Sequence, residues 1–263
     1  MANADVKAMS EKIIGIMGAM PEEIAGVIAL LDNPKPETIG MRTYTSGTIS
    51  GIKTVVVFSR WGKVAAAATV SALIHHYSIT QLIFTGVAGA ISPDLNIGDI
   101  VIATRLIQHD MDARPLMPQF EIPLLGKTYF ETSQSEIDLA TKTITSLFQN
   151  NSLSAAIGNE VLKSFGIDHP KLHIGEIASG DKFFANTSHK NDLLLALPDV
   201  LCIEMEGAAV AQVCYEYAIP FTVIRIVSDV ADDNSHIDFP KFLQQVSSKY
   251  SVAILKELYR SLL

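Results

Sequence analysis

The amino-acid sequence predicts a single α/β domain with a three-layer α/β/α architecture, in which a central, mixed and twisted β-sheet lies between helices. Short apolar segments of strand length alternate with longer segments of helical periodicity. An early pair of segments joined at Gly51 has the pattern of an antiparallel hairpin, which makes the sheet mixed. Because no repeat, low-complexity tract or linker divides the chain, we expect one domain over residues 12–263, preceded by an N-terminal extension over residues 1–11.

The first half of the chain is expected to supply five strands and two helices. Residues 12–17 form a short apolar run that ends at Gly18. Pro21 favours a helix start, because proline suits the first helical turn. An alanine-rich helix is expected over residues 63–76. The other expected strands, each bounded by turn residues, cover 41–50, 52–60, 81–85 and 99–107.

The second half begins with an irregular segment over residues 108–130 that contains Pro115, Pro118 and Pro123. A loop of this length inside a compact domain is usually functional or part of an interface. A final helix is expected over residues 239–262, with apolar residues at helical spacing and Asp238 as its N-cap. The remaining expected helices cover 136–149, 154–165 and 206–217, and the remaining strands cover 172–177, 200–203 and 221–227.

Composition and charge exclude several classes of partner. The net charge of -8 disfavours nucleic acid, whose phosphates require a Lys/Arg surface, although it does not disfavour an uncharged nucleoside. No apolar run reaches membrane-spanning length, and residues 1–11 lack the apolar stretch of a signal peptide. Cys202 and Cys214 are expected to be buried free thiols. We therefore expect a cytoplasmic protein that binds neither membrane nor nucleic acid.

Polar and glycine-rich segments stand at the ends of four expected strands. They cover residues 18–23, 85–89, 204–207 and 225–232. In open α/β sheets, ligands bind beyond the carboxyl ends of the strands. Carboxylates from three of these segments would meet at one edge of the sheet, where like charges in a partly desolvated cleft push carboxyl pKa values apart. This arrangement supplies a proton donor and a proton acceptor near neutral pH.

Each of these segments also has a purely structural interpretation when taken alone. Glu22 and Glu23 favour a helix N-terminus through the helix dipole, and so do Glu204 and Glu206. Asp229 is suited to a loop cap. The Gly-x-x-Gly pattern at 86–89 is a common close-packing turn. The combination of segments, rather than any one of them, points to a site.

Five motifs occur in an order typical of one family. They are Ile-Met-Gly-Ala-Met-Pro-Glu-Glu (16–23), Phe-Thr-Gly-Val-Ala-Gly (84–89), Ser-Gly-Asp-Lys-Phe (179–183), Ile-Glu-Met-Glu-Gly-Ala-Ala (203–209) and Ser-Asp-Val-Ala-Asp (228–232). Over about residues 12–258 the chain resembles the 5′-methylthioadenosine/S-adenosylhomocysteine nucleosidases of the nucleoside phosphorylase superfamily. The resemblance implies a nucleoside phosphorylase-like fold, no cofactor, and a homodimer in which residues 108–123 lie near the partner's site.

The resemblance also implies catalytic roles for four residues. Glu23 matches the base that activates water, and Asp229 matches the acid that protonates purine N7. Ser228 holds Asp229 in place, and Arg225 lies near the attacking water. Such chemistry is required because bond breaking develops oxocarbenium character at the ribose C1′ while electrons flow into the purine. The acid and the base therefore act from opposite faces, as in inverting glycosidases.

The substrate-binding residues implied by the resemblance surround the nucleoside. Glu206 matches the ligand of the ribose hydroxyls, Met205 packs under the sugar, and Phe183 stacks on adenine. Met20, Trp61 and Phe239 match the lining of the 5′-thio pocket. The full expected set is Met20, Trp61, Val87, Ala88, Gly89, Phe183, Phe184, Glu204, Met205, Glu206 and Phe239. Two positions depart from the family pattern, since Val87 stands where serine is frequent and Trp61 where a small aliphatic residue is common.

Several alternatives remain open. A phosphate-dependent nucleoside phosphorylase of the same fold would carry arginine and serine where this chain has Phe84 and Val87, so phosphate ligands are missing. A futalosine-type nucleosidase shares the adenine–ribose site and is not separated by the sequence. A dinucleotide oxidoreductase or a nucleotide-binding regulatory module is disfavoured, because Gly15 and Gly18 do not form a Gly-x-Gly-x-x-Gly fingerprint. Asp229, Asp232 and Asp233 do not fit a calcium loop, and no metal is expected.

Overall fold

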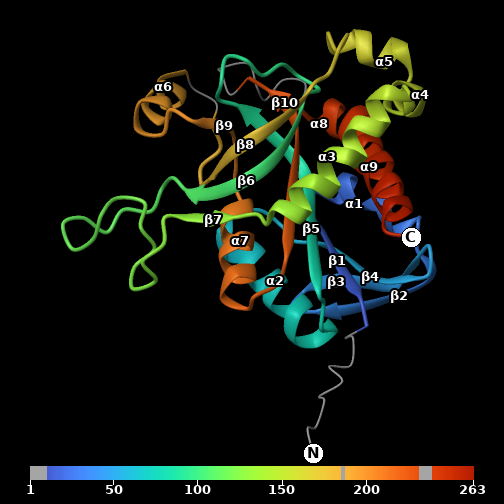
Figure 1. The fold of residues 1–263 in the computed structure, drawn as a ribbon, viewed down its shortest axis with the longest axis horizontal. Coiled ribbons are helices and arrows are strands. Elements are labelled where there is room, and N and C mark those ends of the chain that lie inside the picture. The colour runs from blue at the N-terminus through green and yellow to red at the C-terminus, as the bar shows by residue number, and fades with distance from the viewer. Residues whose placement is uncertain (1–10, 185–186, 231–238) are drawn as a thin grey trace, which may run out of the picture.

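The computed structural model describes residues 11–184, 187–230 and 239–263 and contains a mixed sheet flanked by helices (Figure 1). In these ranges the strands are β1 Ile13–Gly18, β2 Asp32–Ile39, β3 Arg42–Ile49, β4 Ile52–Phe58, β5 Gln81–Ala90, β6 Ile100–Gln108, β7 Tyr129–Glu131, β8 Leu172–Ser179, β9 Val200–Glu204 and β10 Phe221–Asp229. The helices are α1 Pro21–Ile28, α2 Lys63–Tyr77, α3 Gln134–Gln149, α4 Ser152–Ile157, α5 Asn159–Ser164, α6 Thr187–Ala196, α7 Gly207–Glu216, α8 Phe239–Phe242 and α9 Ser248–Ser261, with a π-helical turn at Leu243–Ser247.

The sheet follows the order β10-β6-β8-β9-β5-β1-β4-β3-β2, with β7 paired to β6. Strand β5 also pairs with β10, so β5, β10, β6, β8 and β9 close on one another. The central pairs β1–β4, β1–β5 and β5–β10 are parallel, whereas β3–β4, β6–β10 and β5–β9 are antiparallel. The predicted mixed α/β/α fold is therefore confirmed. The parallel central strands bring the carboxyl ends of β1, β5 and β10 to one edge.

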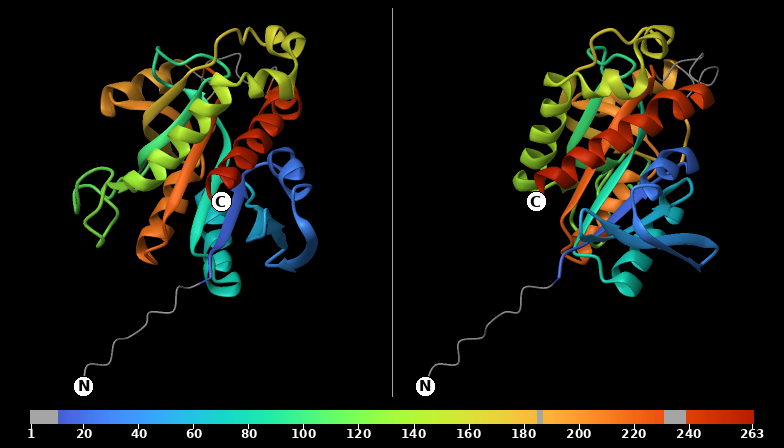
Figure 2. Two further views of the ribbon diagram at one scale, coloured as in Figure 1. Left: turned by 45° about the vertical axis from the view of Figure 1, so that its right-hand side comes forward. Right: turned by 90° about the vertical axis from the view of Figure 1, so that its right-hand side faces the viewer.

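Alternation along each strand explains the two helical layers. Ile14 and Ile16 of β1 pack with α1 and α9, whereas Met17 packs with α2 and α7, because neighbouring side chains of a strand point to opposite faces. Figures 1 and 2 show α1, α3 and α9 together on one side of the sheet. Cys202 and Cys214 are buried free thiols, as expected. Both faces of the central strands are covered, so polar groups meet at the strand ends.

Strand β5 corrects the expectation that residues 85–89 follow a strand. The strand runs on to Ala90, because β10 lies parallel to it as far as Gly89, paired with Asp229, and supplies its hydrogen-bond partners. Ser228 and Asp229 are likewise the last residues of β10 rather than part of a following loop. The glycine-rich segment is therefore extended, paired strand instead of a close-packing turn.

Two expected helices are interrupted. Gly158, with φ of 96°, separates α4 from α5 within the helix expected over residues 154–165. The C-terminal helix has a π-helical turn between α8 and α9 instead of one uniform helix. The expected N-cap of this helix, Asp238, lies outside the described residues. Such π-turns interrupt an α-helix by one extra residue per turn.

Three elements were not predicted from the sequence. Strand β2 is exposed at almost every position and contains Pro34 and Pro36, so it lacks an apolar alternation and exists as an edge strand on β3. Strand β7 lies within the segment expected to be irregular. Helix α6 has little amphipathic pattern, and its residue Leu193 packs beside β8 and β9. Tertiary pairing, rather than local periodicity, forms these elements.

Candidate active site

A cavity of about 380 Å³ lies at the strand edge, where β1, β5, β9 and β10 end. Its volume is in the range of pockets that hold small organic ligands. The structure brings every expected site residue to its wall: Met20, Glu23, Trp61, Val87, Ala88, Gly89, Phe183, Phe184, Glu204, Met205, Glu206, Arg225, Ser228, Asp229 and Phe239. Residues separated by more than 200 positions in sequence therefore share one cavity.

Glu23 is fully buried in the first turn of α1. Its Oε2 accepts hydrogen bonds from the amides of Ala19 at 2.8 Å and Met20 at 2.9 Å, and its Oε1 accepts one from Val87 at 3.1 Å. Burial raises the pKa of its carboxyl to about 7, although the charge of Arg225 and these hydrogen bonds act in the opposite direction. Glu23 thus caps its helix and is also a cavity carboxylate that exchanges a proton near neutral pH.

Gly86 fits against Glu23 because it has no side chain. A Cβ at this position would lie 3.0 Å from Oε1 of Glu23, closer than ordinary van der Waals contact. The neighbouring Val87 directs its amide to the same carboxylate. The glycine in β5 therefore lets the backbone approach the carboxylate of α1, a role that the sequence pattern did not assign.

Arg225 is buried, with its side chain 1% exposed. Its Nη2 donates to Oε2 of Glu204 at 2.7 Å, and its guanidinium carbon lies 4.0 Å from the centre of the Phe84 ring. Nη1 donates to the Phe84 carbonyl at 3.3 Å. No partner for Nε is present among the described residues. A buried charge of this kind is tolerated only when it is paired, and Glu204 provides the pairing.

Glu204 lines the cavity, but both of its carboxylate oxygens accept hydrogen bonds from the protein. Its oxygens accept hydrogen bonds from the Ser179 hydroxyl, from the amides of Glu206 at 3.1 Å and Gly207 at 2.8 and 2.9 Å, and from Arg225. Its Oε2 is thus shared by three donors. These contacts fix the position of Arg225 and of the N-terminus of α7.

Glu206 accepts fewer hydrogen bonds from the protein than Glu204 does. Its Oε1 accepts a hydrogen bond from the Gly62 amide at 2.7 Å, and no other side-chain hydrogen bond of Glu206 is found within the described part of the chain. Burial, followed by the negative charge of Glu204, raises its pKa to about 8. One carboxylate oxygen is therefore anchored, and the other can accept hydrogen bonds from a ligand.

Ser228 and Asp229 end β10 at the same cavity. The Ser228 hydroxyl donates to Oδ2 of Asp229 at 2.7 Å, and the Asp229 side chain is almost fully buried. The hydroxyl also lies 3.4 Å from the carbonyl of Ala88 on the neighbouring strand. The Asp229 carboxyl is therefore held between Ser228 and the end of β10, with Ser228 as a hydrogen-bond donor to it.

Apolar and aromatic side chains form the rest of the cavity wall. The rings of Phe183 and Phe239 meet edge to face at 6.2 Å between centroids. Trp61 is 62% exposed, and its Nε1 donates to the Met20 sulfur at 2.9 Å. Trp61 therefore sits at the mouth of the cavity instead of being a buried packing residue.

Five further residues line the cavity and were not among the expected site residues. They are Ala19, Gly86, Lys182, Ile203 and Pro240. Each lies next to an expected site residue in sequence, so adjacency is the only sequence signal that points to them. Ala19 and Gly86 act through their backbone, which explains why residue type did not identify them.

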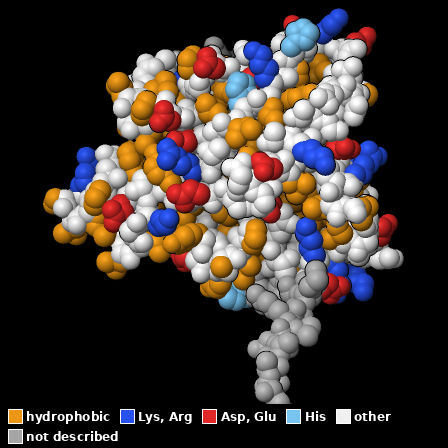
Figure 3. Space-filling model, in the orientation of Figure 1, with side chains coloured by type: hydrophobic (Ala, Val, Ile, Leu, Met, Phe, Trp, Pro, Cys, Tyr) orange, Lys and Arg blue, Asp and Glu red, His pale blue; other side chains and the backbone are white. Residues whose placement is uncertain are grey.

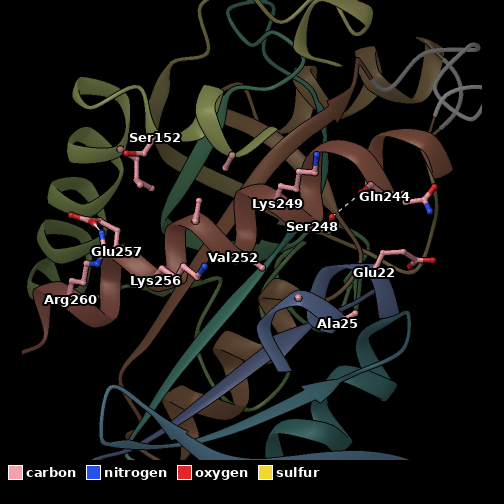
Figure 4. Close-up of a pocket in the computed structure, with 14 residues that line it drawn as sticks. Glu22, Ala25, Ser152, Gln244, Ser248, Lys249, Val252, Lys256, Glu257 and Arg260 are labelled. Atoms are coloured by element: carbon pink, nitrogen blue, oxygen red, sulfur yellow. Dashed lines mark hydrogen bonds and ion pairs between the residues drawn. The ribbon is translucent and has the colours of Figure 1, made fainter. Parts of the chain in front are cut away.

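A second and larger cavity, of about 570 Å³, lies between α1, α4 and α9 (Figure 4). Glu22 and Ala25 of α1 line one wall, whereas Lys249 and Lys256 of α9 line another. Glu22 is exposed, while its neighbour Glu23 is buried in the first cavity. Adjacent helix positions point about 100° apart, which accounts for this division.

The described residues contain neither a cluster of metal-ligating side chains nor a membrane-spanning helix. No group of three or more His, Cys, Asp or Glu side chains there could hold a metal ion. No described helix is long and apolar enough to cross a membrane. Asp232 and Asp233, which were considered as calcium ligands, lie outside the described residues.

Known proteins with sequences similar to this chain belong to one enzyme family. The family model for the phosphorylase superfamily matches residues 13–260. The 5′-methylthioadenosine/S-adenosylhomocysteine nucleosidase of Bacillus subtilis (strain 168) is 32% identical, covering 94% of this chain and 98% of the relative. The enzyme of the same name from Anoxybacillus flavithermus is 33% identical, covering 89% and 92% of the two chains.

Solved structures give the same result. The 5′-methylthioadenosine/S-adenosylhomocysteine nucleosidase of S. pneumoniae, solved with a transition-state inhibitor, has a TM-score of 0.81 and 32% identity, covering 95% of this chain and 99% of its own. The futalosine hydrolase of Helicobacter pylori strain 26695 has a TM-score of 0.80 and 30% identity, covering 95% and 97%. Nucleosidases named for methylthioadenosine/adenosylhomocysteine and a hydrolase named for futalosine therefore share this fold.

Proposed function

The chain belongs to the phosphorylase superfamily and, within it, to the family of 5′-methylthioadenosine/S-adenosylhomocysteine nucleosidases, and we propose that it hydrolyses the N-glycosidic bond of these two nucleosides. The products are adenine and the 5-thio-substituted ribose. One observation carries this proposal: Glu23, Glu206 and Asp229, each at most 7% exposed, surround a single cavity of nucleoside size.

Glu23 is the base in this proposal. A pKa of about 7 means that a large fraction of the carboxyl is ionised at neutral pH and yet basic enough to take a proton from water. Three amide hydrogen bonds fix the carboxylate, so its orientation needs little reorganisation during the reaction. Arg225, whose buried Nε has no partner among the described residues, is the donor that we assign to the attacking water.

Asp229 is the acid. It delivers a proton to purine N7, so that the electrons of the breaking bond flow into a neutral leaving group. The water loses its proton to Glu23 and forms the new bond to C1′, so the proton gained by the purine is balanced by the proton lost from water. The hydrogen bond from Ser228 orients the carboxyl of Asp229 for this transfer.

The ribose and the base are bound by separate parts of the wall. Glu206, with one oxygen anchored by Gly62, accepts hydrogen bonds from the ribose hydroxyls. Met205 packs under the sugar, and Phe183 stacks on adenine. The 5′-thio group lies against Met20, Trp61 and Phe239. Val87, Ala88, Gly89 and Phe184 complete the apolar wall.

Water, rather than phosphate, is the second substrate in this proposal because the described residues of the cavity wall offer no suitable anion site. The described basic lining residues are Lys182 and Arg225. Arg225 is already paired with Glu204, and Lys182 Nζ lies 2.8 Å from Nε2 of His189. Buried carboxylates would repel a phosphate ion in the same space. A phosphorylase reaction is therefore disfavoured.

A futalosine nucleosidase remains the second candidate. The H. pylori futalosine hydrolase matches this chain almost as well in fold as the S. pneumoniae nucleosidase, with TM-scores of 0.80 and 0.81. Curated relatives at 31–33% identity, however, carry the methylthioadenosine/adenosylhomocysteine name. The two substrate classes carry different 5′ substituents, so the part of the cavity that faces the 5′ position should determine which of them is cleaved.

The test is product analysis with purified protein. Methylthioadenosine, adenosylhomocysteine, futalosine and inosine are each incubated with and without phosphate, and the products are separated by chromatography. We expect adenine and free thio-ribose from the first two nucleosides at equal rates with and without phosphate. A ribose 1-phosphate product would overturn the hydrolase assignment, and preferential cleavage of futalosine would overturn the substrate assignment.

We further propose that the protein is a cytoplasmic homodimer. The segment over residues 108–130 projects from the body of the molecule (Figure 1), and hydrophobic side chains gather on this projection (Figure 3). Leu116 and Leu124 on it are 89% and 96% exposed. Exposed apolar surface of this kind is typical of an interface. Light scattering at enzyme concentrations below and above the micromolar range tests the dimer, and a monomeric mass throughout would contradict it.

A further inference from the structure

Three charged residues outside the cavity form a closed set of contacts beside Glu206. Lys63 Nζ contacts Oδ1 of Asp110 at 2.5 Å, and the other oxygen of Asp110 accepts the Asp181 amide at 2.9 Å. Asp181 in turn accepts the Lys63 amide at 2.8 Å. We name this cluster of Lys63, Asp110 and Asp181 the charged ring. It joins the start of α2 to the loops that follow β6 and β8.

The charged ring is continuous with the proposed ribose ligand. Gly62 directly precedes Lys63, and its amide donates to Oε1 of Glu206 at 2.7 Å. Gly62 has φ of 88°, and a Cβ there would lie 3.0 Å from the Asp181 carboxylate. Only glycine accommodates this backbone conformation beside Asp181 without strain. The position of the Gly62 donor therefore depends on both the turn and the ring.

The ring also reaches the proposed adenine wall. Asp181 is followed by Lys182 and Phe183, both of which line the cavity. The segment before Asp181 is tightly packed, because a Cβ at Gly180 would lie 2.2 Å from the His109 ring. Fixing Asp181 therefore restricts where Phe183 stands, although Phe183 itself is 47% exposed.

Charge and burial are consistent with a stable cluster. The side chains of Lys63 and Asp110 are 16% and 31% exposed, so their ion pair is only partly open to solvent. Burial acts to raise the pKa of Asp110, but the hydrogen bonds from Lys63 and the Asp181 amide outweigh it, and the pKa lies below its usual value. The Lys63 ammonium offsets the charge of Asp110, and the Lys63 backbone amide binds the carboxylate of Asp181.

We propose that Lys63, Asp110 and Asp181 are positioning residues, which hold the Gly62 amide against Glu206 and the Phe183 segment against the base, and so set the affinity for the nucleoside. The inference rests on the proposed function, because it assigns ribose binding to Glu206. None of the three residues lines the cavity. Their effect therefore falls on ground-state binding more than on the chemical step.

The test uses Lys63→Met, which keeps an apolar stem and removes the ammonium. We expect KM for methylthioadenosine to rise roughly tenfold while kcat changes less than about threefold, the signature of lost uniform binding. Lys63→Arg should restore most of the affinity. Asp110→Asn should raise KM similarly, and the double variant should be no worse than either single variant, because the ring is broken once.

A matched control comes from the exposed pair between Lys53 and Glu11, whose nitrogen and oxygen lie 2.6 Å apart. Lys53→Met removes a lysine–carboxylate pair far from the cavity and should leave KM unchanged. Equal effects of the two lysine variants, an unchanged KM in Lys63→Met, or a loss confined to kcat would each overturn the proposal.

Amide hydrogen exchange separates this proposal from the proposed function. In ligand-free protein, Lys63→Met should speed exchange at the Gly62, Lys63 and Asp181 amides, and Lys53→Met should not. If the wild type hydrolyses neither methylthioadenosine nor adenosylhomocysteine, the proposed function is overturned. The positioning role of the charged ring in nucleoside binding is then overturned as well. Faster exchange would then show only that the ring orders these loops. If hydrolysis occurs but exchange is unchanged, the ring alone is overturned.

Discussion

The two cavities of this protein differ in a way that volume does not capture. The larger one, about 570 Å³, is an open groove between α1, α4 and α9, with Lys249, Lys256 and Glu257 on its walls (Figure 4). The smaller one, about 380 Å³, gathers buried carboxylates at the ends of strands. Glu23, Glu204 and Glu206 each accept a hydrogen bond from a distant segment, and the pKa values of Glu23 and Glu206 are shifted toward neutrality.

Glu22 and Glu23 present this difference within two consecutive residues. Glu22 faces the groove and is exposed, whereas Glu23 is fully buried and accepts three backbone hydrogen bonds. The lesson is that desolvation and convergent donors, rather than hollow space, prepare a carboxylate for proton transfer. Substitutions at Glu23 and at Glu22 should therefore have very different effects on turnover.

The largest effect is expected from Glu23→Gln. Gln cannot accept the proton of water, so kcat should fall by about 10²- to 10⁴-fold while binding of a substrate analogue is retained. Steady-state kinetics measure kcat, and thermal melts with and without the substrate analogue measure its binding. Glu22→Gln is the matched control and should keep kcat within about twofold, as expected for an exposed residue. Comparable losses in both variants would contradict the division between the two cavities.

The next effect is expected from Asp229→Asn. The amide cannot deliver a proton to N7, so turnover should fall by roughly two orders of magnitude or more, in line with the loss of a general acid. Circular dichroism should show an intact fold, because the amide can still accept the hydrogen bond from Ser228. Near-normal turnover would refute the acid role and leave Asp229 as a structural residue at the end of β10.

A smaller effect is expected at the mouth of the cavity, where Trp61 contacts Met20. Its bulk should favour a compact methylthio group over a homocysteine tail, whose charged ends must remain solvated or paired. We expect kcat/KM to favour methylthioadenosine by about 10- to 200-fold. Trp61→Ile should reduce this ratio and Trp61→Phe should give an intermediate value. A ratio that is the same in all three proteins would show that Trp61 does not select the substrate.

The last effect concerns stability instead of turnover. Burial raises the pKa of Glu23 from 4.5 to about 7, so the folded protein holds a proton that the unfolded chain has lost. This contribution to the free energy of unfolding is fully present below about pH 4.5 and is lost as pH rises through about 7. By linkage it amounts to about 3 kcal/mol.

Thermal melts between pH 4.5 and pH 8 measure this contribution. The wild type should lose stability relative to Glu23→Gln as the pH rises, and Glu22→Gln should follow the wild type. Parallel curves for the wild type and Glu23→Gln would mean that the Glu23 carboxyl is not desolvated. That outcome would remove the contrast between the two neighbouring glutamates.

Part of the fold could be predicted from local pattern alone. Strand β1 and helix α2 were recognised because an apolar run bounded by glycine and an alanine-rich run carry strong local signals. Strand β2 was missed because its exposed, proline-containing sequence has no such signal and is held by β3. The break at Gly158 was missed because a glycine in a helical pattern does not by itself reveal a positive φ.

The alternating α/β order and the anionic, nearly half-hydrophobic composition follow from residue type and short spacing, whereas the roles expected for the cavity residues came from the resemblance to a known family. Three features depend on tertiary contacts: the burial of Glu23 but not of the adjacent Glu22, the pairing of Glu204 with Arg225, and the hydrogen bond from Gly62 to Glu206. The hydrogen bond from Gly62 joins residues 144 positions apart in sequence. The raised pKa values of Glu23 and Glu206 arise mainly from burial, which no local pattern encodes.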